Sequence, residues 1–283
     1  MQLSPPPRLI SPLLSAQMLL GGASAQAGWA ILCFGSIFFW AFAWQADLTD
    51  WRFDAAKFRQ TAGEVVRCEK TKFSVGGSED RAGTPIYRNL YRYAINDQQF
   101  ESASYATGTC ANTGPVTIEY LPDRPEISRI VGMRRSAFGP WVLFVALLPA
   151  AGLIFVTVGL IRGRSRLRLL SAGMPVSSKL VEKAPTLTRV NNRTVYKMTF
   201  QYVAHDGVAR HAIARTHQPE RLEDEPDECV LYDPDNPAQA MLFDTMPGKI
   251  AIDEGGQLQP RSRAFLILPV LATLGNLWWI SRR

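Results

Sequence analysis

The chain has 283 residues, with 31 Lys and Arg against 25 Asp and Glu, four Cys and 47% apolar residues. Three stretches contain no charged residue and no histidine: residues 9–46, 136–161 and 264–281. A helix needs roughly 20 apolar residues to cross a bilayer, so this pattern excludes a single soluble globule. The composition also excludes intrinsic disorder, collagen and a dense disulfide scaffold.

The net charge of +6 arises at the edges of these stretches. Eleven arginines lie in or beside them: Arg8, Arg134, Arg135, Arg162, Arg164, Arg166, Arg168, Arg261, Arg263, Arg282 and Arg283. Without these eleven, 20 basic residues face 25 acidic residues, a balance of −5. Nucleic-acid binding needs basic residues clustered on a folded surface, so nucleic acid is not an expected partner. Arginines at helix ends favour lipid head groups, and the expected partner is therefore the membrane lipid bilayer.

The charge-free stretches predict three transmembrane helices, at residues 25–45, 138–161 and 264–281. A more polar N-terminal segment, residues 1–24, precedes the first. Two alternatives stay open. The N-terminal segment loosely fits a cleaved secretory signal peptide, although a second strongly apolar stretch follows it directly. The third stretch is short enough for a helix that lies on the membrane surface.

The charges beside the helices do not decide the orientation. With the N-terminus inside, eight Lys and Arg lie near the inner helix ends and nine near the outer ends. Cys68 and Cys110 share the first polar segment, whereas Cys229 is alone in the second. Paired cysteines are typical of oxidising compartments. We therefore expect residues 46–137 in the periplasm or extracellular space and residues 162–263 in the cytoplasm.

The two polar segments contain matching blocks in the same order, which indicates an internal duplication. The offsets between matching blocks are 110, 109 and 112 residues. The pairs are residues 61–66 with 171–176, residues 91–97 with 200–206, and residues 120–125 with 232–237. In each polar segment, the three blocks come after a predicted helix. The repeated unit is therefore one helix and one polar domain, and the third helix ends the array.

Both polar segments show the period-two alternation of β-strands. Residues 91–95 and 200–204 alternate apolar and polar side chains, and Asn96-Asp97 and Asp206-Gly207 follow them as hairpin turns. Two-residue turns predict two cross-strand pairs: Tyr93 with Phe100, and Tyr202 with His211. Further strands are expected at residues 63–73, 116–121, 127–131, 173–182, 228–232 and 240–243. The expected fold class is a mixed membrane protein with three transmembrane α-helices and two small antiparallel β-barrel or sandwich domains.

Three motifs of the first polar segment stand out: residues 62–66 (AGEVV), 91–93 (YRY) and 116–125 (VTIEYLPDRP). They resemble the bacterial membrane family called domain of unknown function 3592, with a Gly-x-Val start, a Tyr-x-Tyr strand and a Val-x-Val-Tyr-x-Pro-x-Asn-Pro close. Residues 230–237 (VLYDPDNP) of the second segment match the close better, but Met174-Pro175 interrupts the strand at its start. The two copies cover roughly half the chain. The resemblance implies a fold and a multi-pass setting in the bacterial inner membrane, but no activity.

The three histidines, His205, His211 and His217, lie within 13 residues of one another. Imidazoles bind zinc, copper and nickel, so a metal site is one hypothesis. The predicted hairpin places His205 on one strand face and the other two histidines on the opposite face. Surface histidines are therefore favoured over a metal site.

Cys68 and Cys110 are candidates for a structural disulfide, because the strands expected around them are possible neighbours. The alternative is two free thiols in a cytoplasmic domain. The acidic run at residues 220–228 lacks the alternating ligands and central glycine of a calcium loop, so it is expected to be a solvated loop. No catalytic or phosphate-binding motif occurs in the chain.

These observations predict an integral membrane protein that is not an enzyme and carries no cofactor. The favoured function is a non-catalytic scaffold whose duplicated β domains contact envelope proteins. The alternative is a metal-handling or enzymatic membrane protein that uses the cluster of His205, His211 and His217.

Overall fold

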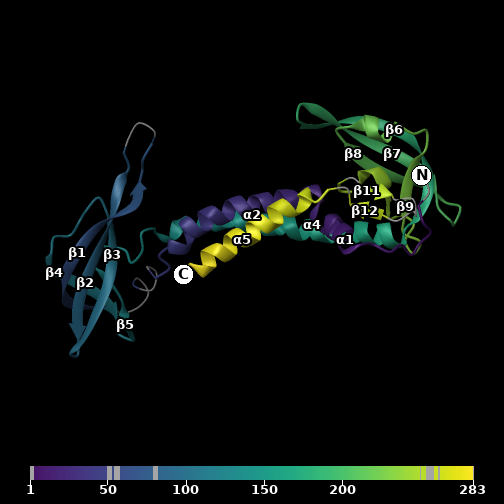
Figure 1. The fold of residues 1–283 in the computed structure, drawn as a ribbon. Coiled ribbons are helices and arrows are strands. Elements are labelled where there is room, and N and C mark those ends of the chain that lie inside the picture. The colour runs from purple at the N-terminus through teal and green to yellow at the C-terminus, as the bar shows by residue number, and fades with distance from the viewer. Residues whose placement is uncertain are drawn as a thin grey trace. The chain divides into compact units, whose positions relative to one another are not determined.

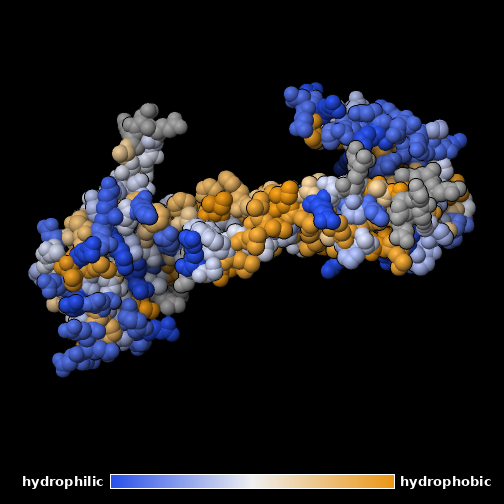
Figure 2. Space-filling model, in the orientation of Figure 1, coloured by the Kyte–Doolittle hydropathy of each residue, from blue (hydrophilic) through white to orange (hydrophobic). Residues whose placement is uncertain are grey.

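A computed structural model of the chain describes residues 3–49, 53, 58–78, 82–248, 250–252, 258–260 and 262–282. Three helices in this part are long and apolar enough to cross a membrane: Ala23–Gln45, Pro140–Ala172 and Ala264–Ser281. Hydrophobic residues gather along them in Figure 2. The chain forms two compact units, one made of Met1–Phe34 with Pro149–Arg283 and the other of Gly35–Leu148. With two antiparallel sheets, the fold is a mixed α and β fold, as the sequence predicted.

The unit Gly35–Leu148 contains a five-stranded antiparallel sheet in the order β3-β2-β1-β4-β5 (Figure 1). Its strands are β1 (Arg59–Val75), β2 (Thr84–Ile95), β3 (Gln98–Thr107), β4 (Gly114–Leu121) and β5 (Arg124–Ile130). The two edge strands approach each other, because the Ile130 N–H of β5 donates to Ser104 Oγ of β3 at 2.9 Å. The sheet therefore curls around its core, which comprises Val65, Tyr91, Tyr93, Ile118 and Ile130.

The β2–β3 hairpin has the predicted register. Asn96 and Asp97 both have positive φ, 48° and 63°, which is the conformation of a two-residue turn between twisted strands. Tyr93 consequently pairs with Phe100, and this prediction is confirmed. Tyr91 and Tyr93 are both buried on one face of β2, as the alternation predicted.

The segments that enter and leave this sheet are joined to each other. Ala46 and Phe138 form a parallel bridge, and Asp47 is buried beside it. The Asp47 carboxylate accepts hydrogen bonds from the backbone N–H of Arg135 at 2.8 Å and of Thr49 at 2.9 Å. The carboxylate thus holds together η1 (Ala43–Gln45) and the residues that lead to η2 (Pro140–Ala146).

The other unit contains a second five-stranded antiparallel sheet, in the order β10-β9-β6-β7-β8 (Figure 1). Its strands are β6 (Met174–Val190), β7 (Arg193–Val203), β8 (Ala209–Thr216), β9 (Glu228–Tyr232) and β10 (Ala240–Leu242). The short elements are η3 (Pro219–Leu222), η4 (Phe243–Thr245), η5 (Ala264–Leu266) and the pair β11 (Ile250–Ile252) and β12 (Leu258–Pro260). The core includes Met198, Phe200, Tyr202, Ala212, Ala214, Val230, Tyr232 and Leu242.

The predicted pairing of Tyr202 with His211 is wrong by one residue. Tyr202 pairs with Arg210, and His211 pairs with Gln201. Within this loop positive φ occurs at Gly207 alone, at 75°, and Gly207 N–H donates to the carbonyl of Ala204. Five residues therefore connect the strands in place of two. A turn followed by one left-handed glycine adds a residue and shifts the register.

The expectation that Met174-Pro175 interrupts a strand is also wrong. Both residues belong to β6, where Met174 pairs with Tyr232 and Pro175 with Leu231 of β9. Pairing of β6 with β7 begins only at Ser178. At Pro175 the strand therefore has a ladder partner on one side only, and proline is tolerated at such positions near a strand end.

The long helices are α2 (Ala23–Ala41), α4 (Leu147–Ala172) and α5 (Ile267–Ser281). Helix α4 continues beyond the charge-free stretch and carries its four arginines within the helix. In the unit that contains Met1–Phe34, α2 and α4 touch through glycines. A Cβ added at Gly159 would lie 2.6 Å from Ala25 Cα, and one at Gly28 would lie 2.5 Å from the backbone nitrogen of Val156. Small residues thus allow the two backbones to approach closely.

The N-terminal segment forms a further helix, α1 (Pro12–Leu20), which packs on the second sheet. The Ser11 hydroxyl caps it by accepting a hydrogen bond from Leu14 N–H at 3.2 Å. Leu14 and Met18 are fully buried in a cluster that also includes Leu170, Leu231, Phe243, Met246 and Leu258. This helix is therefore part of the hydrophobic core of its unit.

Candidate functional site

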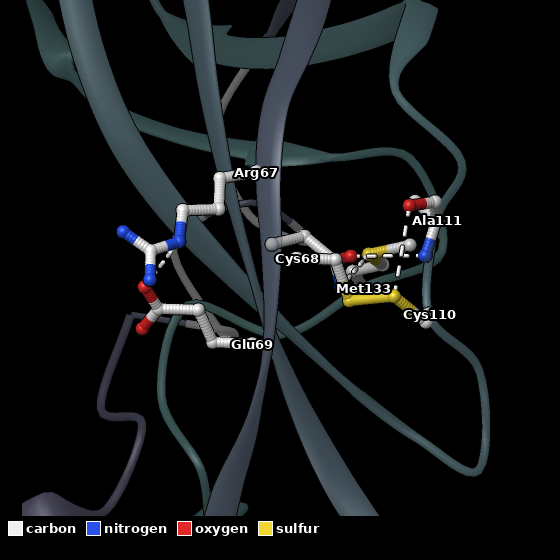
Figure 3. Close-up of a disulfide and its surroundings, with 7 residues drawn as sticks. Arg67, Cys68, Glu69, Cys110, Ala111 and Met133 are labelled. Atoms are coloured by element: carbon white, nitrogen blue, oxygen red, sulfur yellow. Dashed lines mark hydrogen bonds and ion pairs between the residues drawn. A yellow bond between two sulfur atoms is a disulfide. The ribbon is translucent and has the colours of Figure 1, made fainter.

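The cysteines of the first sheet form a disulfide. Cys68 lies in β1 and Cys110 in the loop that precedes β4, with their Cα atoms 6.0 Å apart (Figure 3). Asn89, opposite Cys68 on β2, is fully buried and accepts a hydrogen bond from Ala111 N–H at 2.9 Å. The disulfide and this hydrogen bond anchor the same loop. The arrangement stabilises the fold and leaves no free thiol at these positions.

The structure does not bring the three histidines together as a metal site. His205 lies in the turn after β7 and stacks on Tyr232, with ring centroids 6.0 Å apart. His211 is exposed on β8, on the face opposite to the buried Ala212 and Ala214. In the described ranges, no group of three His, Cys, Asp or Glu residues is arranged to hold a metal ion.

The acidic run differs from the solvated loop that the sequence predicted. Asp224, Glu225 and Asp227 are exposed, but Glu228 is only 4% exposed at the start of β9. Its backbone carbonyl accepts a hydrogen bond from Ser178 Oγ at 2.9 Å. Its side-chain Oε1 has no hydrogen-bond partner in the described part of the chain. The Glu228 side chain shares a hydrogen bond with Asp244 of η4, so the partner of this buried carboxyl is a second carboxyl group.

A pocket of about 230 Å³ opens beside this carboxylate, between the starts of β6 and β9. Its walls include Glu225, Asp227 and Glu228 on the acidic side and Pro175 with Val176 on the apolar side. Ser177 and Cys229 complete the lining. The pocket therefore combines three carboxyl groups with a small apolar wall.

Burial and like charges shape the protonation of this region. Burial, followed by the charges of Asp244, Asp224 and Glu225, raises the pKa of Glu228 to about 7. Burial and the charge of Asp224 also raise the pKa of Asp244, which lies in η4. The pKa of the Cys229 thiol is raised by burial as well, so this thiol is a weak nucleophile.

Arg8 has a structural role rather than the membrane-flank role that the sequence predicted. It is 7% exposed, and its Nη1 donates to the carbonyls of Leu170 and Gly173 at 3.0 Å each. These carbonyls lie at the C-terminal end of α4, where backbone acceptors lack helical partners and a cation is favourable. Arg8 therefore caps α4 and ties the N-terminal segment to the second sheet.

The sequence offered one overlooked indication of the buried carboxyl. Glu228, Val230 and Tyr232 share one face of β9, and the other two belong to the core. The alternation alone could therefore have placed Glu228 toward the interior. Arg8 had no such indication, because its burial depends on contacts between distant segments.

No protein-family model matches the chain, and no curated protein or solved structure matches it either.

Proposed function

We propose that the protein is a non-catalytic scaffold of the bacterial inner membrane that presents one β domain on each side of the bilayer. The observation that carries the two-sided arrangement is the packing of α1 into the core of the second β domain. This contact requires the N-terminal segment and residues 173–260 to lie on the same side. If α2 and α4 both cross the bilayer, the first β domain lies on the opposite side.

The disulfide supports an orientation. Disulfides form in oxidising compartments and are rare in the cytoplasm, and Cys68 is bonded to Cys110 in the first domain. Cys229 of the second domain is an unpaired thiol. The first domain is therefore assigned to the periplasmic or extracellular side, and the second domain to the cytoplasm.

Matching details in the two sheets support a duplicated unit. Each sheet has five strands, and in both the spatial order is the third, second, first, fourth and fifth strand of the unit. Tyr93 Oη donates to the carbonyl of Pro125 at 2.5 Å, and Tyr202 Oη donates to that of Pro237 at 2.6 Å. Each proline ends the corresponding Pro-Asp-x-Pro turn. The repeated motif thus fixes the same contact twice.

The first strands of the two sheets share a second detail. Thr71 Oγ1 donates to the carbonyl of Ile86 at 2.8 Å, and Thr186 Oγ1 donates to that of Val195 at 2.7 Å. Both threonines lie at an irregularity in the pairing of the first strand with the second. Two sequences that fold independently have no reason to repeat such an irregularity. A small, partly closed barrel built from this repeat is the proposed domain.

The same contacts explain the resemblance to domain of unknown function 3592. Its motifs coincide here with a core strand, a hairpin turn and the turn that accepts the tyrosine hydroxyl. Motifs of this kind preserve a fold rather than a reaction. We therefore propose membership of that family in two copies, with envelope proteins as the partners.

Two exposed positions allow the topology to be tested. Gln99 of β3 and Ile213 of β8 both face solvent. In a protein with Cys33 and Cys229 replaced by serine, Gln99→Cys is expected to react with a membrane-impermeant maleimide in intact spheroplasts. Ile213→Cys is expected to react only after permeabilisation. The reverse pattern contradicts the orientation, and labelling of both from outside contradicts the two-sided arrangement.

The scaffold role needs a test of its own. A photo-crosslinking amino acid at Gln99 or Ile213 is expected to give discrete adducts with other envelope proteins, identified by mass spectrometry. A crosslinker at Asp97, in the turn beside Gln99, serves as a positional control. If every adduct contains only lipid or the protein itself, the scaffold proposal fails.

A further inference from the structure

We propose that the end of the β6–β7 hairpin, residues 187–193, docks on the anionic phospholipid surface of the bilayer that the long helices cross. Leu187 enters the interface, and Arg189 faces the lipid phosphates. The inference rests on the membrane placement in the proposed function. It adds a contact between the second β domain and the bilayer that the scaffold proposal does not contain.

An exposed leucine is the first support. The side chain of Leu187 is as exposed as in an isolated extended peptide, with an exposed fraction of 105%. No other large hydrophobic residue of the described ranges is as exposed, and Val190, three residues further on, is exposed as well. Transfer of apolar side chains from water into an apolar environment is favourable. The hairpin end therefore offers an apolar surface that the domain itself does not use.

The corresponding hairpin of the first sheet has a different composition. It joins β1 to β2 through residues 76–83 (GGSEDRAG), which include two acidic residues and no large apolar residue. Residues 185–194 (PTLTRVNNRT) of the β6–β7 hairpin include Leu187, Val190 and two arginines, and no acidic residue. A hairpin at this place in the fold does not need such residues. Their presence in the second unit indicates a contact outside the domain.

The hairpin end lies at the height of the expected membrane surface. Within the unit that contains Pro149–Arg283, Figure 1 shows it level, along the axis of the long helices, with the ends of α2 and α5 nearest to the second sheet. The first charged residues beside the apolar helices on this side are Arg162 in α4 and Arg263 before η5, and arginines at such positions mark the head-group region. Helix α4 continues past this level to Ala172. The sheet thus stands away from the bilayer, and the hairpin turns back to it.

The charge of the hairpin end suits an anionic surface. Arg189 is exposed and has no ion pair among the described residues. Arg193 has only a long contact, 3.7 Å, with Glu220 of η3, and both side chains are largely exposed. A basic side chain near an anionic bilayer increases binding about fivefold. The helices also hold the bilayer beside the hairpin in every molecule, so its effective concentration exceeds that of a separate protein partner.

The test uses the full chain in lipid nanodiscs, with Cys33 and Cys229 replaced by serine. Val190→Cys carries an environment-sensitive fluorophore, and spin-labelled lipids quench this fluorophore on contact. In discs of equal parts phosphatidylglycerol and phosphatidylcholine, we expect a blue-shifted emission and strong quenching, and weaker quenching in phosphatidylcholine alone. Val208→Cys is the matched control, because this exposed valine lies in the β7–β8 turn at the opposite end of β7. Its label is expected to stay unquenched.

Two substitutions separate the apolar and the electrostatic contributions. With the label at Val190→Cys, Leu187→Ser is expected to lower the ratio of docked to undocked hairpin about tenfold in both lipid mixtures. Arg189→Gln is expected to lower this ratio about fivefold, and only with phosphatidylglycerol. Lys179→Gln, the same charge change near the start of β6, is expected to leave the ratio unchanged. All three side chains are exposed, so the domain is expected to stay folded in each variant.

A label within the membrane helix distinguishes failure of this inference from failure of the proposed function. Phe155 is exposed on α4, so a label at Phe155→Cys is expected to be quenched whether or not the hairpin docks. An unquenched Phe155 label overturns the membrane placement, and this inference with it. A quenched Phe155 label together with an unquenched Val190 label overturns the docking alone.

Two other outcomes also overturn the proposal. A blue-shifted Val190 label that lipids do not quench shows that the hairpin contacts protein, either a second copy of the chain or another partner. Equal docking of Arg189→Gln and Lys179→Gln in discs with phosphatidylglycerol shows that Arg189 does not face lipid phosphates.

Discussion

Tyr202 of β7 donates a hydrogen bond from its hydroxyl to the carbonyl oxygen of Pro237, 35 residues further along the chain. The bond joins the central hairpin of the second sheet to the turn between β9 and β10. Tyr93 makes the corresponding bond to Pro125 in the first sheet. Each bond ties a core strand to a proline at the end of the repeated Pro-Asp-x-Pro motif, which connects the last two strands of its sheet.

Replacing either tyrosine by phenylalanine is expected to weaken its own domain. Tyr202→Phe and Tyr93→Phe each leave a carbonyl without its donor, which costs about 1 kcal/mol of unfolding free energy. Urea-dependent pulse proteolysis of the full chain measures the unfolding free energy of each domain. Tyr87→Phe is the control, since Tyr87 in β2 is only partly buried. Equal stabilities of Tyr93→Phe and Tyr87→Phe contradict the stabilising role of the bond.

The disulfide is expected to supply much of the stability of the first domain. Cys68 and Cys110 are 42 residues apart, and closing a loop of this length restricts the unfolded chain by about 4 kcal/mol on the entropic account. Cys68→Ser with Cys110→Ser is therefore expected to lower the unfolding free energy of this domain by about that amount. Pulse proteolysis under non-reducing conditions measures this loss of unfolding free energy. Cys33→Ser serves as the control, and a double variant as stable as this control contradicts the prediction.

Stability of the second domain is expected to fall as the pH rises from about 4.5 to about 7. In this window Glu228 stays protonated in the folded state, because its pKa is about 7, but ionises in the unfolded state, where its ordinary value is 4.5. The unfolded state then binds fewer protons, so the unfolding free energy falls, by about 3 kcal/mol in all. Glu228→Gln is expected to reduce this fall, since Asp244 with its raised pKa still contributes, and to be more stable than the unaltered protein at pH 8.

Urea titrations at pH 5 and pH 8, read by proteolysis of the second domain, measure this difference. Asp97→Asn is the matched control, because its carboxyl lies in an exposed turn of the other domain. A pH dependence that persists unchanged in Glu228→Gln contradicts the role assigned to this carboxyl.

The sequence predicted the local features that one strand or one turn determines. The buried face of Tyr91 and Tyr93 follows from alternation alone, and Asn96-Asp97 places two residues tolerant of positive φ side by side. In the Asp206-Gly207 turn, by contrast, positive φ occurs only at the glycine. An Asp-Gly pair supports turns of different length, so the register of this hairpin could not be predicted. The turn at Asn191 and Asn192, both with positive φ, was recognisable and was missed.

Features that depend on distant segments were beyond the sequence. The sequence places Arg8 among the arginines that flank membrane helices. Its burial could not be predicted, because the carbonyls that it binds lie some 160 residues further along the chain. The sequence divided the charge-free stretch at residues 9–46 into a more polar segment and a membrane helix, but it gave no sign that the first part forms a helix in the core of a β domain. Composition is nearly the same in a core helix and a membrane helix, so only the packing separates α1 from α2.

The packing of α1 predicts that the N-terminal segment is retained and needed for stability. Leu14 is fully buried, so Leu14→Ala is expected to cost about 2–5 kcal/mol. Leu9→Ala is the matched control, since Leu9 is 88% exposed. Pulse proteolysis compares the unfolding free energies of the second domain in the two variants. The intact mass of protein extracted from membranes is expected to include α1, and a mature chain that begins after residue 24 contradicts this prediction.

The contact of α2 with α4 predicts opposite effects of one substitution at two glycines. Alanine is a better helix former than glycine by about 1 kcal/mol, so Gly275→Ala in α5, where an added Cβ meets no atom within 4 Å, is expected to be neutral or slightly stabilising. At Gly159 the added Cβ meets the backbone of Ala25, and overpacking of this kind costs about 1–3 kcal/mol. Gly159→Ala is therefore expected to be the less stable variant. Detergent-induced unfolding followed by tryptophan fluorescence measures both, because Trp29 lies on α2 and Trp278 on α5. If Gly159→Ala is as stable as Gly275→Ala, the close approach of α2 and α4 does not hold.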